Sequence, residues 1–119
     1  MSNSSKIKIS RYESTIKKIL TNTIHIEIYD PLIKLATIVD VRLTNDKSIA
    51  KIYISCYDKN IIDKILSKIN GASGYFRTIL AKELNWRKAP QVIFVKDNTQ
   101  EKFDEVQNII NSWKEKSNG

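Results

Sequence analysis

The sequence is poor in cysteine, histidine, proline and glycine, and it has no long apolar run. Its one cysteine, Cys56, cannot form an internal disulfide, so we expect a reducing compartment. Cys56 lies in the β-branched run IAKIYISCY, which favours a buried structural thiol over a catalytic one. No stretch approaches the ~18 apolar residues of a transmembrane helix, and the N-terminus lacks the hydrophobic core of a signal peptide. We therefore expect a cytoplasmic protein that does not bind a membrane.

The motifs of common enzyme classes are also missing. The sequence contains no G-x-S-x-G, Walker A, H-E-x-x-H or C-x-x-C motif. Its one histidine, His25, lies near Glu27 and Asp30, but a metal site would need a second histidine or a cysteine. A histidine near a helix end has a simpler role, because its positive charge complements the helix dipole. We expect no catalytic residue, metal, cofactor or small-molecule substrate, and a small hydrolase that uses His25 is the alternative among enzymes.

Positive charge is abundant but unevenly distributed. The 119 residues carry 20 Lys and Arg against 13 Asp and Glu, a net charge of +7. The excess is +4 in residues 1–24 and +5 in residues 63–96, whereas residues 97–119 carry −2. Such basic segments indicate a polyanionic partner, most often nucleic acid. The alternative interpretation is that the lysines are solvated surface residues, and that the positive charge reflects a proteome that is basic in general.

Hydrophobic spacing predicts a single domain that begins with a helix. Residues 1–7 are polar and are expected to be a flexible N-terminus. A helix is expected from about Ser10 to Ile26, because apolar positions recur at steps of three and four residues: Tyr12, Ile16, Ile19, Leu20 and Thr23. Its start is marked by Ser10 and Glu13, which form an S-x-x-E capping box. Asp30 and the following proline then end the helical region, since proline disfavours helix at the residue before it.

Two β-branched runs, residues 36–43 and 49–57, flank the turn signal TND and predict a hairpin. The first run is expected to place Val39, Val41 and Leu43 on one face. The second run alternates and is expected to place Ala50, Ile52, Ile54 and Cys56 on one face. One face of the hairpin is apolar, so a layer of helices should cover it.

The second half of the chain predicts two helices, a strand and a last helix. Asn60 is a plausible N-cap of the first helix, and the second runs to about Leu84. Residues 92–95 form a short third strand. Residues 100–119 should form a C-terminal helix that packs on the domain or extends from it, with the apolar positions Phe103, Val106, Ile110 and Trp113.

The stretch NGASGYFR, residues 70–77, places two glycines inside a strong helical pattern. It spells G-x-x-G, the loop that lets backbone amides of KH domains approach phosphates. Its two central residues, Ala72 and Ser73, are not cations, so a second interpretation is a helix end at Gly71 and a new helix capped by Ser73. We favour a kink formed by Ala72, Ser73 and Gly74, where small residues allow close backbone packing.

A second basic cluster, Trp86-Arg87-Lys88, follows the helical region. An aromatic ring beside two cations could stack on a base or pack on RNA sugar. The alternative, which we favour, is that Trp86 closes the core while the two cations stay solvated. Tyr53 and Tyr57 are weaker stacking candidates on the open strand face.

Four segments in this order and spacing resemble the ribosome-binding factor A family, over about Arg11 to Thr99. They are EIYDP (27–31), TIVDVRLTNDKSIAKIYIS (37–55), ASGYFR (72–77) and WRKAPQVIFVKDNT (86–99). The resemblance implies an α+β, type II KH-like domain over residues 8–99, with the order α-β-β-α-α-β and an Ala-x-Gly kink between two helices. It also implies binding of the 30S ribosomal subunit or its precursor, support of late 16S rRNA maturation and 5′-end processing, importance in the cold, and no enzyme activity or cofactor.

We predict that a basic surface binds RNA phosphates, and that the protein is a monomer. The cations assigned to this surface are Lys8, Arg11, Lys18, Arg77, Arg87 and Lys88. Shape recognition is favoured over base reading, because structured RNA is recognised largely through its backbone and 2′-hydroxyls. A KH-like protein-interaction module that does not act on rRNA is the alternative.

Overall fold

The structure is a computed structural model that describes residues 2–97, with side chains from Ile7 onward. The expected C-terminal helix and the last two residues of the expected 8–99 domain lie outside the described residues. The elements in chain order are α1 (Ser2–Asn22), η1 (Thr23–Glu27), η2 (Ile33–Leu35), β1 (Thr37–Leu43), β2 (Ile49–Ser55), η3 (Lys59–Ile61), α2 (Ile62–Gly71), α3 (Ser73–Leu84) and β3 (Gln91–Lys96). The predicted order α-β-β-α-α-β is confirmed.

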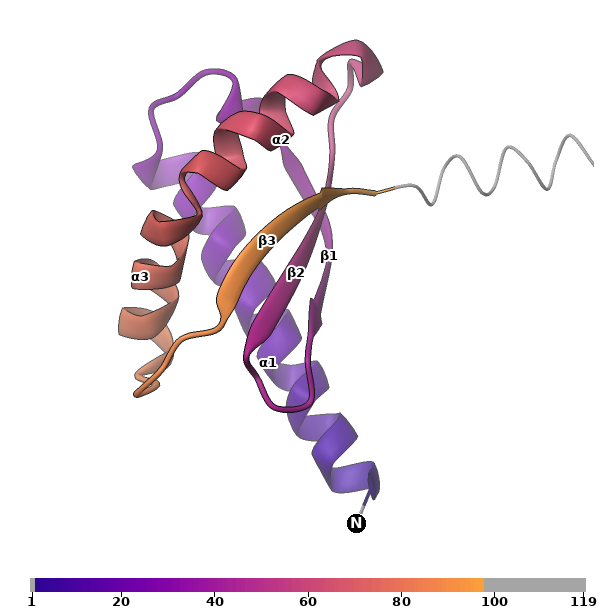
Figure 1. The fold of residues 1–119 in the computed structure, drawn as a ribbon, viewed down its shortest axis with the longest axis vertical. Coiled ribbons are helices and arrows are strands. Elements are labelled where there is room, and N and C mark those ends of the chain that lie inside the picture. Colours follow the sequence, from indigo (N-terminus) through magenta and orange to yellow (C-terminus); the bar gives the residue numbers. More distant parts are fainter. Residues whose placement is uncertain (1, 98–119) are drawn as a thin grey trace, which may run out of the picture.

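The strands form one sheet in the order β1-β2-β3, with β1 and β2 antiparallel and β2 and β3 parallel. Helix α1 packs chiefly on β1, whereas α2 and α3 pack on β3 (Figure 1). Strands β2 and β3 alternate between residues buried under the helices and residues on the opposite face, and β1 does so except at a bulge. The domain therefore has two layers, which confirms the α+β class.

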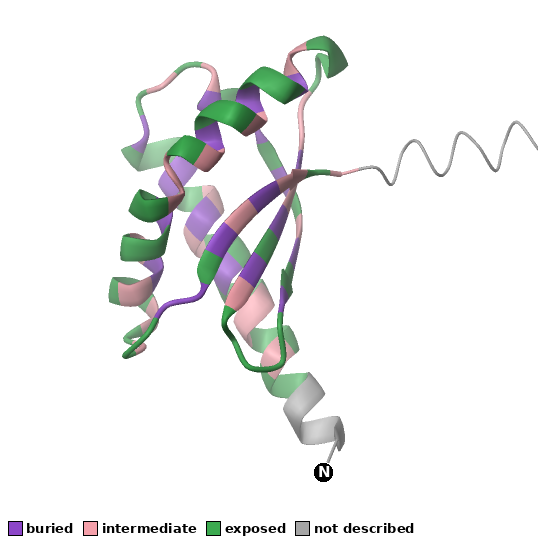
Figure 2. Cartoon of the chain, viewed as in Figure 1, coloured by how far each residue is buried: buried purple, intermediate pink, exposed green. Residues whose placement is uncertain are grey.

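One apolar core lies between the helices and the sheet (Figure 2). Ile16 of α1, Ile52 of β2, Ile65 of α2 and Phe76 of α3 are all 0% exposed. Burial of a side chain of this size stabilises the fold by about 1.5–3 kcal/mol. The rings of Phe76 and Phe94 meet edge to face with centroids 5.1 Å apart, which joins α3 to β3.

Helix α1 begins at Ser2, so the predicted helix start at Ser10 is wrong. The backbone of residues 2–7, expected to be a flexible terminus, belongs to this helix. Glu13 does not close a capping box: its Oε2 accepts a hydrogen bond of 2.8 Å from the backbone N–H of Leu43 on β1. The S-x-x-E pattern was misleading because the glutamate serves a strand distant in sequence.

At its C-terminal end α1 widens into η1, a π-helix. The backbone N–H of Ile28 donates to the carbonyl of Thr23 at 3.2 Å, five residues back. Ile16, Leu20, Ile24 and Ile28 succeed one another at steps of four residues, and all four are buried.

A β-bulge shifts the register of β1 between Ile38 and Asp40. Ile38 is buried, whereas Val39 is 37% exposed, so the predicted common face of Val39, Val41 and Leu43 is wrong at its first member. A bulge adds one residue to a strand, and strict alternation fails at that point. The alternation expected of β2 is confirmed by its buried residues Ala50, Ile52 and Ile54.

The entry into α2 differs from the prediction, because Asp58 and not Asn60 is the capping residue. The Asp58 Oδ1 accepts a hydrogen bond of 3.0 Å from the backbone N–H of Asn60, at the start of the 3-10 turn that precedes α2. Asparagine and aspartate are both common caps, so the sequence alone did not separate them.

The joint between α2 and α3 is confirmed, but its predicted cause is wrong. Gly71 is the last residue of α2, Ala72 separates the helices, and Ser73 opens α3 without a side-chain capping bond. A Cβ atom added at Gly71 or Gly74 would meet nothing within 4 Å, and neither glycine has a positive φ. Neither tight packing nor backbone strain therefore requires a glycine at this joint.

Side chains satisfy backbone groups at both edges of the sheet. At the β3 edge, the Asn70 side chain of α2 donates to the carbonyl of Phe94 and accepts from its N–H, each at 2.9 Å. At the β1 edge, Asp40 Oδ1 accepts from the N–H of Val41 at 2.9 Å, next to the contact between Glu13 and β1. Such contacts replace the strand that an open edge would otherwise attract.

Candidate nucleic-acid interface

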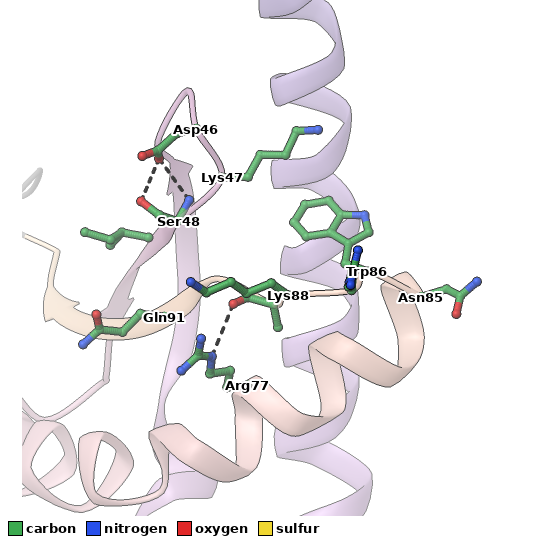
Figure 3. Close-up of a pocket in the computed structure, with 11 residues that line it drawn as sticks. Asp46, Lys47, Ser48, Arg77, Asn85, Trp86, Lys88 and Gln91 are labelled. Atoms are coloured by element: carbon green, nitrogen blue, oxygen red, sulfur yellow. Dashed lines mark hydrogen bonds between the residues drawn. The ribbon is translucent and has the colours of Figure 1, made fainter.

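A basic pocket lies where the β1–β2 turn, the end of α3 and the start of β3 meet (Figure 3). Its volume is about 780 Å³. Three of the predicted cations, Arg77, Arg87 and Lys88, line it together with Lys47. The fold thus brings cations from the β1–β2 turn, α3 and the α3–β3 connection to one site, which we call the basic pocket.

The connection between α3 and β3 positions three of these cations. Asn85 has φ 54° and ends α3 in the left-handed conformation, as is common at helix C-termini. Ala89 is buried, and its carbonyl accepts a hydrogen bond of 3.3 Å from Nε of Arg77 (Figure 3). Because Arg77 is exposed overall, its other guanidinium donors remain available to a ligand beside Arg87 and Lys88.

Trp86 forms the wall between the pocket and helix α1. Its ring meets Tyr12 edge to face with centroids 4.9 Å apart, and it packs against the core. The Nζ of Lys47 lies 4.8 Å from the Tyr12 ring centroid and 5.6 Å from that of Trp86. The preference for a core role of Trp86 is therefore confirmed, and the aromatic pair holds a cation that the sequence interpretation did not single out.

Lys47 was missed because nothing in the sequence of the turn ties it to distant aromatics. It has φ 61°, a left-handed conformation that lysine seldom adopts, and this turn geometry points its side chain at Tyr12 and Trp86. The available signal was weak: Lys47 follows the turn residue Asp46 and lies between two strands of a predicted hairpin.

Among residues 2–97, Asp46 is the one carboxylate that lines the basic pocket. Its Oδ1 accepts hydrogen bonds from the Ser48 hydroxyl, the Thr44 hydroxyl and the Ser48 backbone N–H, at 2.7, 2.8 and 3.0 Å. These bonds lower the pKa of Asp46 from 3.8 to about 2. The carboxylate is engaged in shaping the turn, and the pocket keeps four cations against this single acid.

The other three predicted cations do not line the basic pocket. Lys8 and Arg11 are exposed on the N-terminal half of α1, near Tyr12 and hence toward the same end of the molecule. Lys18 lies in a separate groove between α1 and α3, which Glu27 and Glu83 also line. Two carboxylates beside Lys18 make that groove a poorer phosphate site than the basic pocket.

The kink residues Ala72, Ser73 and Gly74 also lie outside the basic pocket. The adjacent Tyr75 hydroxyl donates to Glu27 at 2.9 Å, and this bond is the main cause that raises the pKa of Tyr75. This bond ties the end of the kink to η1, the segment that follows α1.

Among residues 2–97, no group of three or more His, Cys, Asp or Glu side chains is placed to hold a metal ion. His25 is exposed in η1 and lines a shallow hollow with Lys17 and Lys18. No helix within the described part of the chain is both long enough and apolar enough to span a bilayer.

Comparison with known sequences identifies the family. A family model described as Ribosome-binding factor A matches residues 8–110. Ribosome-binding factor A of Malacoplasma penetrans is 57% identical over 116 residues, which cover 98% of this chain and all of that protein. Ribosome-binding factor A of Mycoplasmoides gallisepticum is 42% identical over 89% of each chain.

Solved structures agree with this result and with the KH-like fold. The solution structure of a Thermotoga maritima relative has a TM-score of 0.68 and 30% identity, and the match covers 76% of this chain and 87% of that chain. A Thermus thermophilus ribosome-binding factor A model, fitted into a cryo-EM map of its complex with the 30S subunit, has a TM-score of 0.61 at 24% identity over 71% of this chain and 90% of that chain. The chain belongs to the ribosome-binding factor A family.

Proposed function

We propose that this protein binds the small ribosomal subunit or its precursor, and that the basic pocket is its principal contact with 16S rRNA. The observation that carries the proposal is the gathering of Lys47, Arg77, Arg87 and Lys88 around one surface pocket. The Thermus thermophilus relative, which is described in complex with the 30S subunit, supports the choice of partner.

The cations of the pocket suit phosphate recognition. The planar guanidinium groups of Arg77 and Arg87 can each donate two hydrogen bonds to one phosphate, whereas Lys88 acts as a point charge. Lys8 and Arg11 extend positive charge along α1 from the same end of the molecule. Such contacts fix the position of folded RNA without reading bases.

Gly71 and Gly74 supply a second surface. Both are exposed, and the space around them is open, so the backbone from Ala72 to Gly74 can come close to a sugar–phosphate chain. This contact is secondary to the basic pocket, because the kink carries no cation of its own.

The protein acts by shifting a conformational equilibrium and not by catalysis. A factor that binds one rRNA conformation more tightly than another favours it by no more than the difference in binding free energy. That bias supports late maturation and 5′-end processing of 16S rRNA by other proteins. It matters most in the cold, where wrong RNA pairings dissociate slowly.

We also propose that the protein acts as a monomer in the cytoplasm. The side chains of Glu13, Asp40 and Asn70 occupy backbone groups at the two sheet edges. An added strand from a second copy would have to displace them.

Co-sedimentation with purified 30S subunits, across a salt series from about 50 mM to about 0.5 M, tests the proposal. The double variant Arg87→Glu, Lys88→Glu should bind at least tenfold more weakly, and the slope of log affinity against log salt should fall by about 2. The double variant Lys59→Glu, Lys64→Glu is the matched control, because it makes the same charge change on exposed residues of η3 and α2 outside the pocket. Equal weakening by both folded variants would contradict the assignment of the basic pocket.

The rival function is a protein-interaction module that does not act on rRNA. It predicts that most of the affinity for the 30S subunit survives in about 0.5 M salt, where phosphate contacts are largely lost. A hydrolase that uses His25 predicts instead that His25→Ala abolishes an activity while 30S binding is unchanged.

A further inference from the structure

The side of the sheet opposite α1, α2 and α3 carries an apolar patch with a charged border. We call it the open sheet face and define it by Asp40, Arg42, Lys51, Tyr53, Ile93 and Val95. The strand register aligns Asp40, Tyr53 and Val95 in one row and Arg42, Lys51 and Ile93 in the neighbouring row. Residues aligned on one face of adjacent strands are in side-chain contact.

The centre of this face is apolar. Tyr53, Ile93 and Val95 are only partly buried, whereas Ile52 and Phe94, which point to the other face, are buried under the helices. Asp40, Arg42 and Lys51 border the patch: Nε of Arg42 lies 3.0 Å from Oδ2 of Asp40, and Nζ of Lys51 lies 6.0 Å from the Tyr53 ring centroid. An apolar patch with a charged rim is typical of a docking surface.

The chain itself supplies an occupant of matching length. Strand β3, which supplies Ile93 and Val95 to the open sheet face, ends at Lys96, and 22 residues, 98–119, follow the described part. A helix over residues 101–113 would be about 20 Å long. Three strands span only about 10 Å between the axes of the outer two, so a helix of this length can cross the sheet.

The composition of this segment also matches the face. Its apolar residues Phe103, Val106, Ile110 and Trp113 are spaced by three or four positions, which places them on one side of a helix. Residues 101–105 hold three acids against one lysine, opposite in sign to Lys51 on the border of the face. The β3 edge is a poorer site, because Asn70 already occupies both backbone groups of Phe94 there.

We propose that residues 101–113 form an amphipathic helix whose apolar stripe lies on the open sheet face of the same molecule. Phe103, Val106, Ile110 and Trp113 cover the apolar patch, and the acids of residues 101–105 face Lys51. The helix then covers Tyr53, which removes this tyrosine from the candidates for base stacking. The proposal does not depend on RNA binding.

Tryptophan fluorescence of the full chain tests this arrangement. Trp86→Phe retains an aromatic ring against Tyr12 and leaves Trp113 as the single tryptophan of the chain. In that background Trp113 emission should be blue-shifted, and quenching by acrylamide should be several-fold weaker than for a synthetic peptide of residues 98–119. Ile93→Lys with Val95→Lys should restore peptide-like emission and quenching while circular dichroism shows a folded domain.

The matched control is the double variant Ile26→Lys, Leu35→Lys, which adds the same two charges at exposed apolar residues of η1 and η2 outside the open sheet face. It should leave Trp113 protected. The proposal is overturned if Trp113 is as accessible in the full chain as in the peptide, or if the lysines on β3 do not release it. Protection that disappears on dilution also overturns it, because the occupant would then be a second copy.

Discussion

Replacement of Asn70 by alanine should lower the free energy of unfolding by about 2 kcal/mol. The Asn70 amide makes two hydrogen bonds of 2.9 Å to the backbone of Phe94, each worth about 1 kcal/mol net. Their loss leaves the N–H and C=O of a 2% exposed edge residue without these partners, which adds to the cost. Alanine gains about 0.5 kcal/mol of helix propensity near the end of α2, and this gain offsets part of the loss.

The assay is thermal and urea unfolding followed by circular dichroism. A loss of about 2 kcal/mol should lower Tm by roughly 10 °C in a domain of this size. Asn22→Ala is the matched control, because Asn22 is an exposed helical asparagine whose side chain makes no capping bond, and it should change stability by less than about 0.5 kcal/mol. Equal stability of the Asn70→Ala and Asn22→Ala proteins would refute the claim that Asn70 secures β3.

Asn70→Asp separates the two hydrogen bonds. A carboxylate can still accept from the Phe94 N–H, but it repels the Phe94 carbonyl, so the folded protein should raise the pKa of this new carboxyl above about 3.9. Its neutral form donates to the carbonyl, and that stabilisation is present below the unfolded pKa and is lost as pH rises through the folded pKa. Relative to the parent protein, Asn70→Asp should therefore be more stable at pH 3 than at pH 7.

Three further outcomes are expected. Gly71→Ala and Gly74→Ala should each raise the free energy of unfolding in urea by about 0.5 kcal/mol, since an added Cβ meets nothing within 4 Å and neither glycine has a positive φ. A decrease in that free energy of more than about 1 kcal/mol would show that the joint needs glycine. Asp46→Asn should reduce the loss of thermal stability between about pH 4 and pH 2. The fold lowers the pKa of Asp46 to about 2, so the stabilisation by its carboxylate is lost as pH falls through that window; an unchanged profile would contradict this role. Burial and the nearby Asp58 raise the pKa of Cys56, so iodoacetamide at pH 8 should modify the thiol more slowly in the folded protein than in urea; equal rates would exclude protection by the fold.

Local patterns predicted the order of the elements well, but they predicted the boundaries of the elements and the buried faces less well. The helical spacing around Ile16 and the alternation in β2 correctly identified core residues, because both depend on periodicity along one element. The predicted start of α1 was wrong because Glu13 does not cap the helix; it bonds to Leu43 on β1, 30 residues away. The predicted face of Val39 was wrong because β1 contains a bulge. A bulge arises from the pairing of two strands, and the sequence of one strand carries no clear sign of it.

The sequence predicted some of the cations of the basic pocket but not all of them. Arg87 and Lys88 stand out as a basic pair beside an aromatic residue, and Arg77 falls in a segment typical of the family. Lys47 could not be assigned, since its place over Tyr12 and Trp86 depends on how the turn, α1 and the α3–β3 connection meet in space. Lys18 was assigned by its charge alone, and the structure places it beside Glu27 and Glu83.

The π-helix at the end of α1 explains how residues four apart stay in the core. An α-helix advances by about 100° per residue, so each step of four residues overshoots a full turn by about 40°. Ile16, Leu20, Ile24 and Ile28 would drift around the helix and bring the last of them toward solvent. The wider turn at η1 subtracts from this overshoot and returns Ile28 to the buried side. The π-turn therefore works as a phase correction that absorbs one extra residue. Deletion of one residue within His25–Glu27 should restore an ordinary α-helix and still leave Ile28 on the buried side, because a step of three residues undershoots a full turn by about 60° and cancels most of the accumulated overshoot.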